Sequence, residues 1–240
     1  MADGATIPFI SRYRKEATGS LDEVALFKIA TRSAELEELA KRKAYVLSTI
    51  EGQGKLTDDL RQRIEETLDP VTLEDIYLPF KPKRRTRAQI ARENGLEPLA
   101  KIIMAQNCAT PHRSAERFIT DTVTSAEEAV KGASDIIAEW VNENETVRSR
   151  VRENFRRYAV ITSKVAKGKE TEGANFATYF DYSAPLSRCG SHNYLAMRRG
   201  EAEGILKVSI DIDTDRALAR LMPMFVKRNA TEECLSLVHI

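Results

Sequence analysis

Two clusters of cations are the residues in this 240-residue sequence that are best suited to chemistry with phosphate. The first is a basic loop within PFKPKRRTR, residues 79–87, whose five cations are interrupted by no acid. Its cations are Lys81, Lys83, Arg84, Arg85 and Arg87. Cations that neutralise phosphates release condensed counterions, which gives affinity without sequence preference, and arginine can hold two phosphate oxygens at once. We predict phosphate contacts here; the alternative is a solvated loop, or one salt-bridged to the acidic helices of residues 20–77.

The second cluster lies on the outer face of a predicted long helix. Its candidate phosphate ligands are Arg148, Arg152, Arg156 and Arg157. Glu153 is the one acid between residues 148 and 169, so this face can follow a phosphate backbone. The alternative is that these arginines pair with acids such as Glu143 and Glu145, as they often do on exposed helices.

Metal chemistry finds little support in the sequence. The histidines are far apart and lack ligand spacing: His112, His192 and His239. Asp211, Asp213 and Asp215 resemble the start of a calcium loop, but Arg216 stands where that loop requires glycine. We interpret these aspartates as a polar helix cap, and we predict no metal or other cofactor.

Catalysis also lacks a recognisable constellation. Ser191 and His192 are neighbours in sequence, whereas a catalytic pair is assembled in space. The sequence has no GxGxxG, P-loop or GxSxG motif. We therefore predict that the chain is not an enzyme.

Composition sets the broad class. Apolar residues are 42% and charged residues 30% of the sequence, which is typical of a soluble globular protein. The net charge of +1 creates no global attraction to nucleic acid or membrane, so any attraction must be local. No CxxC pair occurs, the opening MADGATIPFI lacks the features of a signal peptide, and no window approaches a membrane span. We expect a cytoplasmic protein with no membrane partner.

Helical patterns dominate the first half of the sequence. A capping box of Ser20 and Glu23 is expected to open a long helix that reaches about residue 51. Thr57 is expected to cap the next helix, and further helices are predicted near 88–94 and 97–106. The apolar stripe of the long helix recurs at helical spacing: Ile29, Leu36, Leu39, Ala40, Leu47 and Ile50.

The second half is expected to contain one long helix and one strand. Ser125 and Glu128 form a second capping box for a short helix ending near Gly132, and a long helix is predicted over about 133–166. Residues 181–190 look like a loop and 191–199 like a helix. Alternation in 205–210 predicts the only strand, and a last helix from about Asp213 is expected to break near Pro223. The predicted class is all-α with at most a minor β element.

Several blocks resemble the N-terminal region of the Tex family of transcription accessory proteins. The strongest are GATIPFISRYRKEATGSLDE at 4–23, LEDIYLPFKPKRRTRAQIARENGLEPLA at 73–100 and GASDIIAEWVNEN at 132–144. YFDYSAPL at 179–186 and SHNYLAMRRGEAEGILKV at 191–208 follow. The sequence departs from the family pattern at Cys189-Gly190 and at Asn193, so no role is carried over to Ser191-His192.

The resemblance implies a domain plan and a function. It implies a helical region with a helix-turn-helix-like unit at 1–105, a long-helix region at 106–190, and at 191–240 a connector that leads toward a ribonuclease-H-like domain outside this chain. The many apolar residues of the last segment would then lack the domain against which they pack, and their exposure could drive self-association. The implied function is a helical scaffold that binds RNA or DNA without sequence preference. The alternative is a protein-interaction scaffold that docks on RNA polymerase or on other domains of its own protein.

Overall fold

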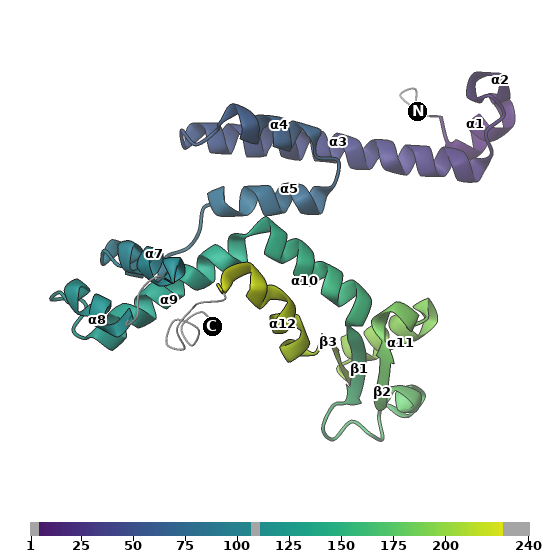
Figure 1. Ribbon diagram of the computed structural model, residues 1–240. Helices are drawn as coiled ribbons and strands as arrows, with labels where there is room; N and C mark the ends of the chain where they lie inside the picture. Colours follow the sequence, from purple (N-terminus) through teal and green to yellow (C-terminus); the bar gives the residue numbers. More distant parts are fainter. Residues whose placement is uncertain (1–4, 107–110, 228–240) are drawn as a thin grey trace. The chain divides into compact units, whose positions relative to one another are not determined.

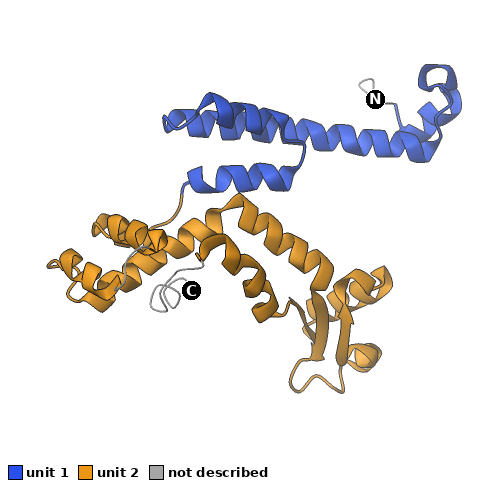
Figure 2. Cartoon of the chain, viewed as in Figure 1, with its two compact units in different colours: residues 1–82 blue, residues 83–240 orange. Residues whose placement is uncertain are grey.

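The structure is a computed structural model that describes residues 5–106 and 111–227. It divides into two compact units, residues 1–82 and residues 83–240, which are coloured separately in Figure 2. Helices make up most of the described residues, and the described strands all lie in the second unit (Figure 1). The mainly helical class is confirmed, whereas the division at 1–105, 106–190 and 191–240 stays a prediction.

Unit 1 is built around one helix of 30 residues. Asp22 caps this helix by accepting a hydrogen bond from the Ala25 backbone N–H at 2.7 Å. The expected Ser20–Glu23 capping box is wrong, because Ser20 takes a positive φ of 64° in the turn after Gly19 and precedes the true cap. The elements of unit 1 are α1 (Ile7–Tyr13), α2 (Lys15–Thr18), α3 (Glu23–Gly52), α4 (Asp58–Glu66), α5 (Pro70–Tyr77) and the 3-10 turn η1 (Leu78–Phe80).

The core of unit 1 gathers on the second half of α3. Leu39, Val46 and Ile50 of α3 are buried against apolar residues of α4 and α5. The predicted stripe is therefore right for Leu39 and Ile50, but Ile29 and Leu36 are 51% and 38% exposed. The periodicity identified the helix correctly; which of its turns are covered depends on where α4 and α5 pack.

The short elements of unit 1 follow local rules. Thr57 caps α4 as predicted, since its hydroxyl accepts from the Leu60 N–H at 3.2 Å. Asp58 and Asp59 occupy the first turn, where the helix dipole favours negative charge.

The helical part of unit 2 packs four helices around one core. Those helices are α6 (Arg87–Glu93), α7 (Glu97–Ala105), α8 (Pro111–Ala115) and α9 (Ala126–Glu143), with the 3-10 turn η2 (Glu116–Phe118) before α9. Ser125 caps α9 as predicted, but the Glu128 carboxylate accepts from Thr124 instead of closing the box. Gly132 does not end the helix: a Cβ there would lie 2.5 Å from Leu96 Cδ1, so the glycine lets Leu96 approach α9 closely.

The helix predicted over 133–166 is wrong in extent. Asn144 takes extended backbone angles and accepts from the Val147 N–H at 3.1 Å, so it ends α9 and caps a separate helix, α10 (Glu145–Tyr158). Beyond Ala159 the chain becomes β1 (Val160–Val165). Residues Val160, Ile161 and Thr162 are β-branched and favour strands, and pairing on both sides of β1 overrides the helical spacing that continued through them.

The small sheet of unit 2 has the antiparallel order β2-β1-β3. Its outer strands are β2 (Asp181–Pro185) and β3 (Leu206–Asp211), and Thr162 of β1 lies opposite Ser183 and Ser209. The strand predicted at 205–210 is confirmed within a residue, but it is not the only strand. The loop predicted at 181–190 is wrong, because this range contains β2 and the 3-10 turn η4 (Leu186–Arg188). The five residues of β2 are too few for their alternation to be recognised in the sequence without the partner strand.

Helix α11 (Ser191–Ala202) and the 3-10 turn η3 (Ala174–Tyr179) pack against this sheet. Their small core joins Phe176 to Ile205 and Leu206. Gly200 permits the contact, since a Cβ there would meet Leu206 Cδ1 at 2.7 Å and Phe176 Cδ1 at 3.0 Å. α11 thus continues past the glycine at which the sequence pattern placed its end.

The last described helix, α12 (Thr214–Phe225), folds back beside α10 (Figure 1). Asp213 caps it by accepting from the Arg216 N–H at 3.1 Å, as the polar-cap interpretation expected. Pro223 does not break the helix, which reaches Phe225. The Gln106 amide holds the end of α12: it donates to Phe225 O at 2.5 Å and accepts from Lys227 N at 2.8 Å. The apolar residues after 227, on which the self-association expectation depends, lie outside the described residues.

Candidate nucleic-acid interface

The basic loop enters unit 2 through an ion network on α9. Lys83 Nζ lies 2.5 Å from Glu139 Oε1 and also pairs with Glu143. Arg92 of α6 reaches the same Glu139 carboxylate at 3.2 Å, and the Thr86 hydroxyl donates to it at 3.3 Å. Lys83, the second cation of the loop, is therefore held by acids.

Glu139 is the centre of that network, with its side chain only 12% exposed. Burial is the largest single influence on its pKa and acts to raise it. Hydrogen bonds and charges from Lys83 and Arg92 together outweigh burial and lower the pKa below its ordinary value. The carboxylate is thus kept ionised, and its charge compensates the loop.

The rest of the loop is divided between paired and unpaired cations. Arg85 pairs with Glu93 at 2.7 Å, and Arg87 lies 3.6 Å from Asp135. Within residues 5–106 and 111–227, neither Lys81 nor Arg84 has a carboxylate partner. The paired loop cations use acids of α6 and α9, rather than the acids of residues 20–77 that the sequence-based alternative suggested. The pattern leaves Arg84 as the most available cation of unit 2's portion of the loop.

Helix α10 carries the second predicted cluster. Arg157 pairs with Glu153 at 2.6 Å, and Arg148 and Arg152 also have interaction partners. Arg156 is exposed and has no carboxylate partner in the described part of the chain. Lys164, which the longer predicted helix would have added to this face, lies in β1 instead.

A third group of cations was missed by the sequence analysis. Arg216 and Arg220 of α12 both reach Tyr158 at the end of α10, with their Cζ atoms 4.0 and 4.7 Å from the ring centroid. Arg220 also donates to the Tyr158 hydroxyl at 3.0 Å and to Asn154 Oδ1 at 2.9 Å. The spacing of the two arginines on one helix was visible in the sequence, but their meeting with Tyr158 requires the fold.

The charge of this group acts on Tyr158 itself. The hydrogen bond from Arg220 is the main cause that lowers the pKa of the Tyr158 hydroxyl, and the charges of Arg220 and Arg216 add to it. Because α12 brings Arg216 and Arg220 to the Tyr158 ring, the end of α10 is surrounded by more positive charge than its own sequence contains.

Other chemistry is limited in the described residues. No group of three or more His, Cys, Asp and Glu side chains in those residues is arranged to hold a metal ion. Asp213 serves as a helix cap and Asp211 accepts from the Ser209 hydroxyl. None of the described helices is both long and apolar enough to cross a bilayer.

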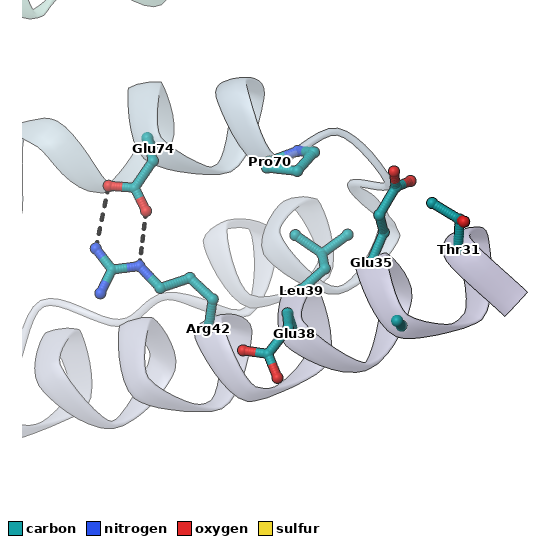
Figure 3. Close-up of a pocket in the computed structure, with 8 residues that line it drawn as sticks. Thr31, Glu35, Glu38, Leu39, Arg42, Pro70 and Glu74 are labelled. Atoms are coloured by element: carbon teal, nitrogen blue, oxygen red, sulfur yellow. Dashed lines mark hydrogen bonds and ion pairs between the residues drawn. The ribbon is translucent and has the colours of Figure 1, made fainter.

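Unit 1 has an open groove along α3 and α5, shown in Figure 3. Its volume is about 730 Å³, and Leu39 and Pro70 provide apolar walls. Arg42 spans the two helices with a bidentate pair to Glu74, at 2.6 and 3.1 Å. The groove thus combines apolar walls with a compensated charged end, which suits protein contact better than phosphate.

Comparison with known proteins places these features in a family. The family model described as Tex central region-like matches residues 106–234, more than half of the chain, and that described as Tex-like protein N-terminal domain matches residues 1–51. This chain belongs to the Tex family. The predicted family is thereby confirmed.

Individual relatives include two proteins that carry the Tex name and one human protein that does not. The transcriptional accessory protein Tex of Neisseria gonorrhoeae is 45% identical over 89% of this chain and 28% of its own length. Protein tex of Bordetella pertussis is 45% identical over 89% of the chain and 27% of its own length. The human S1 RNA-binding domain-containing protein 1 is 27% identical over 88% of the chain and 22% of its own length. The chain therefore spans about a quarter of the length of these relatives.

Proposed function

We propose that this chain is a helical nucleic-acid-binding portion of a Tex-like transcription accessory factor, acting in the cytoplasm and without catalytic activity of its own. Its arginines contact backbone phosphates of RNA or DNA and do not read bases. The observation that carries the proposal is the composition of α10, in which five arginines meet two glutamates within fourteen residues. Such a helix has a local positive field although the whole chain is nearly neutral.

The geometry ranks the predicted contact residues. Arg84 in the loop and Arg156 on α10 lack carboxylate partners in the described residues, so binding a phosphate costs them no ion pair. A phosphate would have to compete with an existing carboxylate partner at three other cations, namely Lys83, Arg85 and Arg157. The names of the relatives, which include a transcriptional accessory protein and a protein with an S1 RNA-binding domain, support the same class of partner.

A salt titration tests the proposal. The 240-residue chain is titrated with a single-stranded RNA at two salt concentrations, and about four neutralised phosphates predict a log–log slope of about −3. Arg84→Gln with Arg156→Gln should flatten the slope by about 1.4, at about 0.7 for each phosphate that is no longer neutralised. Absence of RNA and DNA binding at low salt would refute the proposal, and magnesium-dependent cleavage of RNA would refute its non-enzymatic part.

The charge-matched control is built from cations whose pairing is local. Lys101 pairs with Glu97 at 2.9 Å and Arg198 pairs with Glu201, each one turn away on an exposed helix face. Lys101→Gln with Arg198→Gln removes the same formal charge as the test variant. This control should leave the slope within error of the unchanged chain.

The groove of unit 1 favours a second candidate, a protein-interaction scaffold. Its occupant would be one helix of a partner protein, with an apolar side against Leu39 and Pro70 and basic residues at its margins. Glu35, Glu38 and Glu74 line the groove and pair with Arg32, Lys41 and Arg42. Glu35 and Glu38 are paired only along an exposed helix face, where ion pairs are weak, so basic residues of the partner can share these carboxylates.

RNA polymerase is the probe for this second candidate. Ala34 is exposed and lines the groove, so Ala34→Arg would fill it and add repulsive charge. Affinity for purified bacterial RNA polymerase should fall in this variant while RNA affinity stays constant. Equal polymerase binding by the variant and the unchanged chain would remove the groove from the function.

A further inference from the structure

Arg216 and Arg220 are held in place by neutral groups. They lie one turn apart on α12 and share the ring of Tyr158, at 4.0 and 4.7 Å from its centroid. Arg220 is fixed further by the Tyr158 hydroxyl at 3.0 Å and by Asn154 Oδ1 at 2.9 Å. Asn154 is buried, so its amide is a firm anchor for the guanidinium.

The hydrogen-bond inventory of these two arginines is far from used. A guanidinium has five N–H donors in one plane. Arg220 uses one donor on each terminal nitrogen, for Asn154 and Tyr158, and the other donors remain. In the described residues no carboxylate pairs with either arginine. Two acids of this region have other partners. Asp213, which lines a recess with Arg216, accepts from the Arg216 backbone N–H, and Glu153 pairs with Arg157.

Arg42 of unit 1 shows that stacking by itself does not indicate a ligand site. Its guanidinium also stacks on tyrosines, at 5.0 Å from the Tyr45 ring and 5.3 Å from the Tyr77 ring. There, however, Glu74 takes a bidentate pair and neutralises the charge. The distinguishing feature at α12 is an oriented cation pair that keeps its charge.

A third cation shares the same surface. Arg150 and Arg220 line a recess of about 240 Å³ together with Glu153 and Asn154. Arg150 is exposed and has no carboxylate partner in the part of the chain that the structure describes. This recess is open to solvent. Arg216 lines a second, smaller recess of about 60 Å³, which shares Asn154 with the first and also contains Asp213.

We propose that Arg150, Arg216 and Arg220 form a binding surface for the backbone phosphates of a nucleic acid, with Arg150 and Arg220 in one recess and Arg216 in the adjoining one. The inference rests on the proposed function and assigns it residues outside the clusters that the sequence indicated. Arginine is suited to the task because its planar fork matches two phosphate oxygens. Holding the forks in advance lowers the entropy cost of binding, and Tyr158, Asn154 and the Gln106 clamp on α12 provide that support.

The central experiment compares RNA affinities of matched variants by fluorescence anisotropy. Arg216→Gln with Arg220→Gln should weaken binding of a single-stranded uridine oligonucleotide about tenfold at low salt, as expected for loss of a charge-assisted hydrogen bond. The salt slope should flatten by about 0.7 for each phosphate released. The Lys101→Gln and Arg198→Gln control should change neither quantity.

Two further variants separate loss of the site from loss of the fold. Arg150→Gln touches none of the bonds between α10 and α12, and should still weaken RNA binding about threefold, a modest share of the effect of a charge-assisted hydrogen bond. Tyr158→Phe keeps the stacking ring but removes the hydroxyl that holds Arg220, and should have a similar effect. Circular dichroism should show unchanged helicity and melting temperature for Arg150→Gln. Full RNA affinity in both single variants would overturn the inference.

A second arm identifies the source of the phosphate independently. Inorganic phosphate is titrated into the unmutated chain while the side-chain Nε–Hε resonances of Arg216 and Arg220 are followed by NMR, with chloride as the control. RNA binding that does not depend on the three arginines overturns the inference and leaves the proposed function standing. Phosphate-specific shifts without any RNA binding would support the phosphate site but refute nucleic acid as the source of the phosphate, together with the proposed function. If phosphate causes no shifts and the chain does not bind RNA, both the inference and the proposed function are overturned.

Discussion

The basic loop and the arginine cluster of α10 and α12, which consists of Arg150, Arg216 and Arg220, are both rich in cations. They differ in which groups hold those cations in place. Lys83 is held by Glu139 and Glu143, so the loop's charge is largely compensated by its own protein. Arg216 and Arg220 are held by a tyrosine and an asparagine, which orient the guanidiniums and leave their charge. We therefore expect a cation to bind phosphate more readily where the groups that hold it are neutral than where they are carboxylates.

Removing Glu139 should have the largest effect on stability. Glu139→Gln keeps the shape but leaves Lys83 and Arg92 without their shared carboxylate, and should lower the free energy of unfolding by about 2 kcal/mol at pH 7, the cost of losing hydrogen bonds to a charged group. Urea unfolding measures this change. RNA affinity should rise, because the positive charge of Lys83 and Arg92 is no longer compensated by Glu139.

The same comparison has a defined pH dependence. Because the folded-state pKa of Glu139 is lowered, its contribution is complete above the unfolded value of about 4.3 and is lost as the pH falls through the folded value. The stability difference between the unchanged chain and Glu139→Gln should therefore be full at pH 7 and shrink toward about pH 3. A difference that is equal at both ends would exclude an ionised Glu139 as the source.

Asn154→Ala should produce the next largest change. It removes the buried acceptor that holds Arg220, and the free energy of unfolding should fall by about 1 kcal/mol because Arg220 itself remains hydrated. RNA affinity should fall at the same time, by about threefold. The paired result would sharpen the contrast with Glu139→Gln, which lowers stability but raises affinity. A loss of stability with unchanged RNA affinity would mean that Arg220 does not need its anchor.

Single substitutions within the loop should differ in a smaller but measurable way. Arg84→Gln should flatten the salt slope of RNA binding by about 0.7, whereas Arg85→Gln and Arg87→Gln should change it little, because their acids already compensate them. Anisotropy at several salt concentrations gives the three slopes. Equal slopes for the three variants would show that the ion pairs of the loop do not survive RNA binding.

The smallest expected effect is a shift in the pKa of Tyr158. The hydroxyl should titrate below the ordinary tyrosine value, and Arg220→Gln should return it upward because the main cause of the lowering is removed. NMR of ring-labelled tyrosine follows this titration in the unchanged chain and in the variant. A Tyr158 titration that does not respond to Arg220→Gln would contradict the geometry of the cluster.

Local signals in the sequence predicted much of the fold. The helical class, the long helix α3 and the caps at Thr57, Ser125 and Asp213 follow from side-chain periodicity and from hydrogen bonds within one turn. The errors fall where distant segments intervene. β1 was interpreted as helix because β-branched residues continued a helical spacing, and only its pairing with β2 and β3 decided otherwise.

The sequence by itself determined the family, the helical class and the positions of two cation clusters, because motif, periodicity and composition are all properties of neighbouring residues. Only the tertiary structure decided which cations keep their charge. Lys83 meets Glu139, and Tyr158 meets Arg216 and Arg220, across long stretches of chain. The electrostatic value of a cation depends on the group that the fold places within a few ångströms of it, and that group is not specified by the cation's neighbours in sequence.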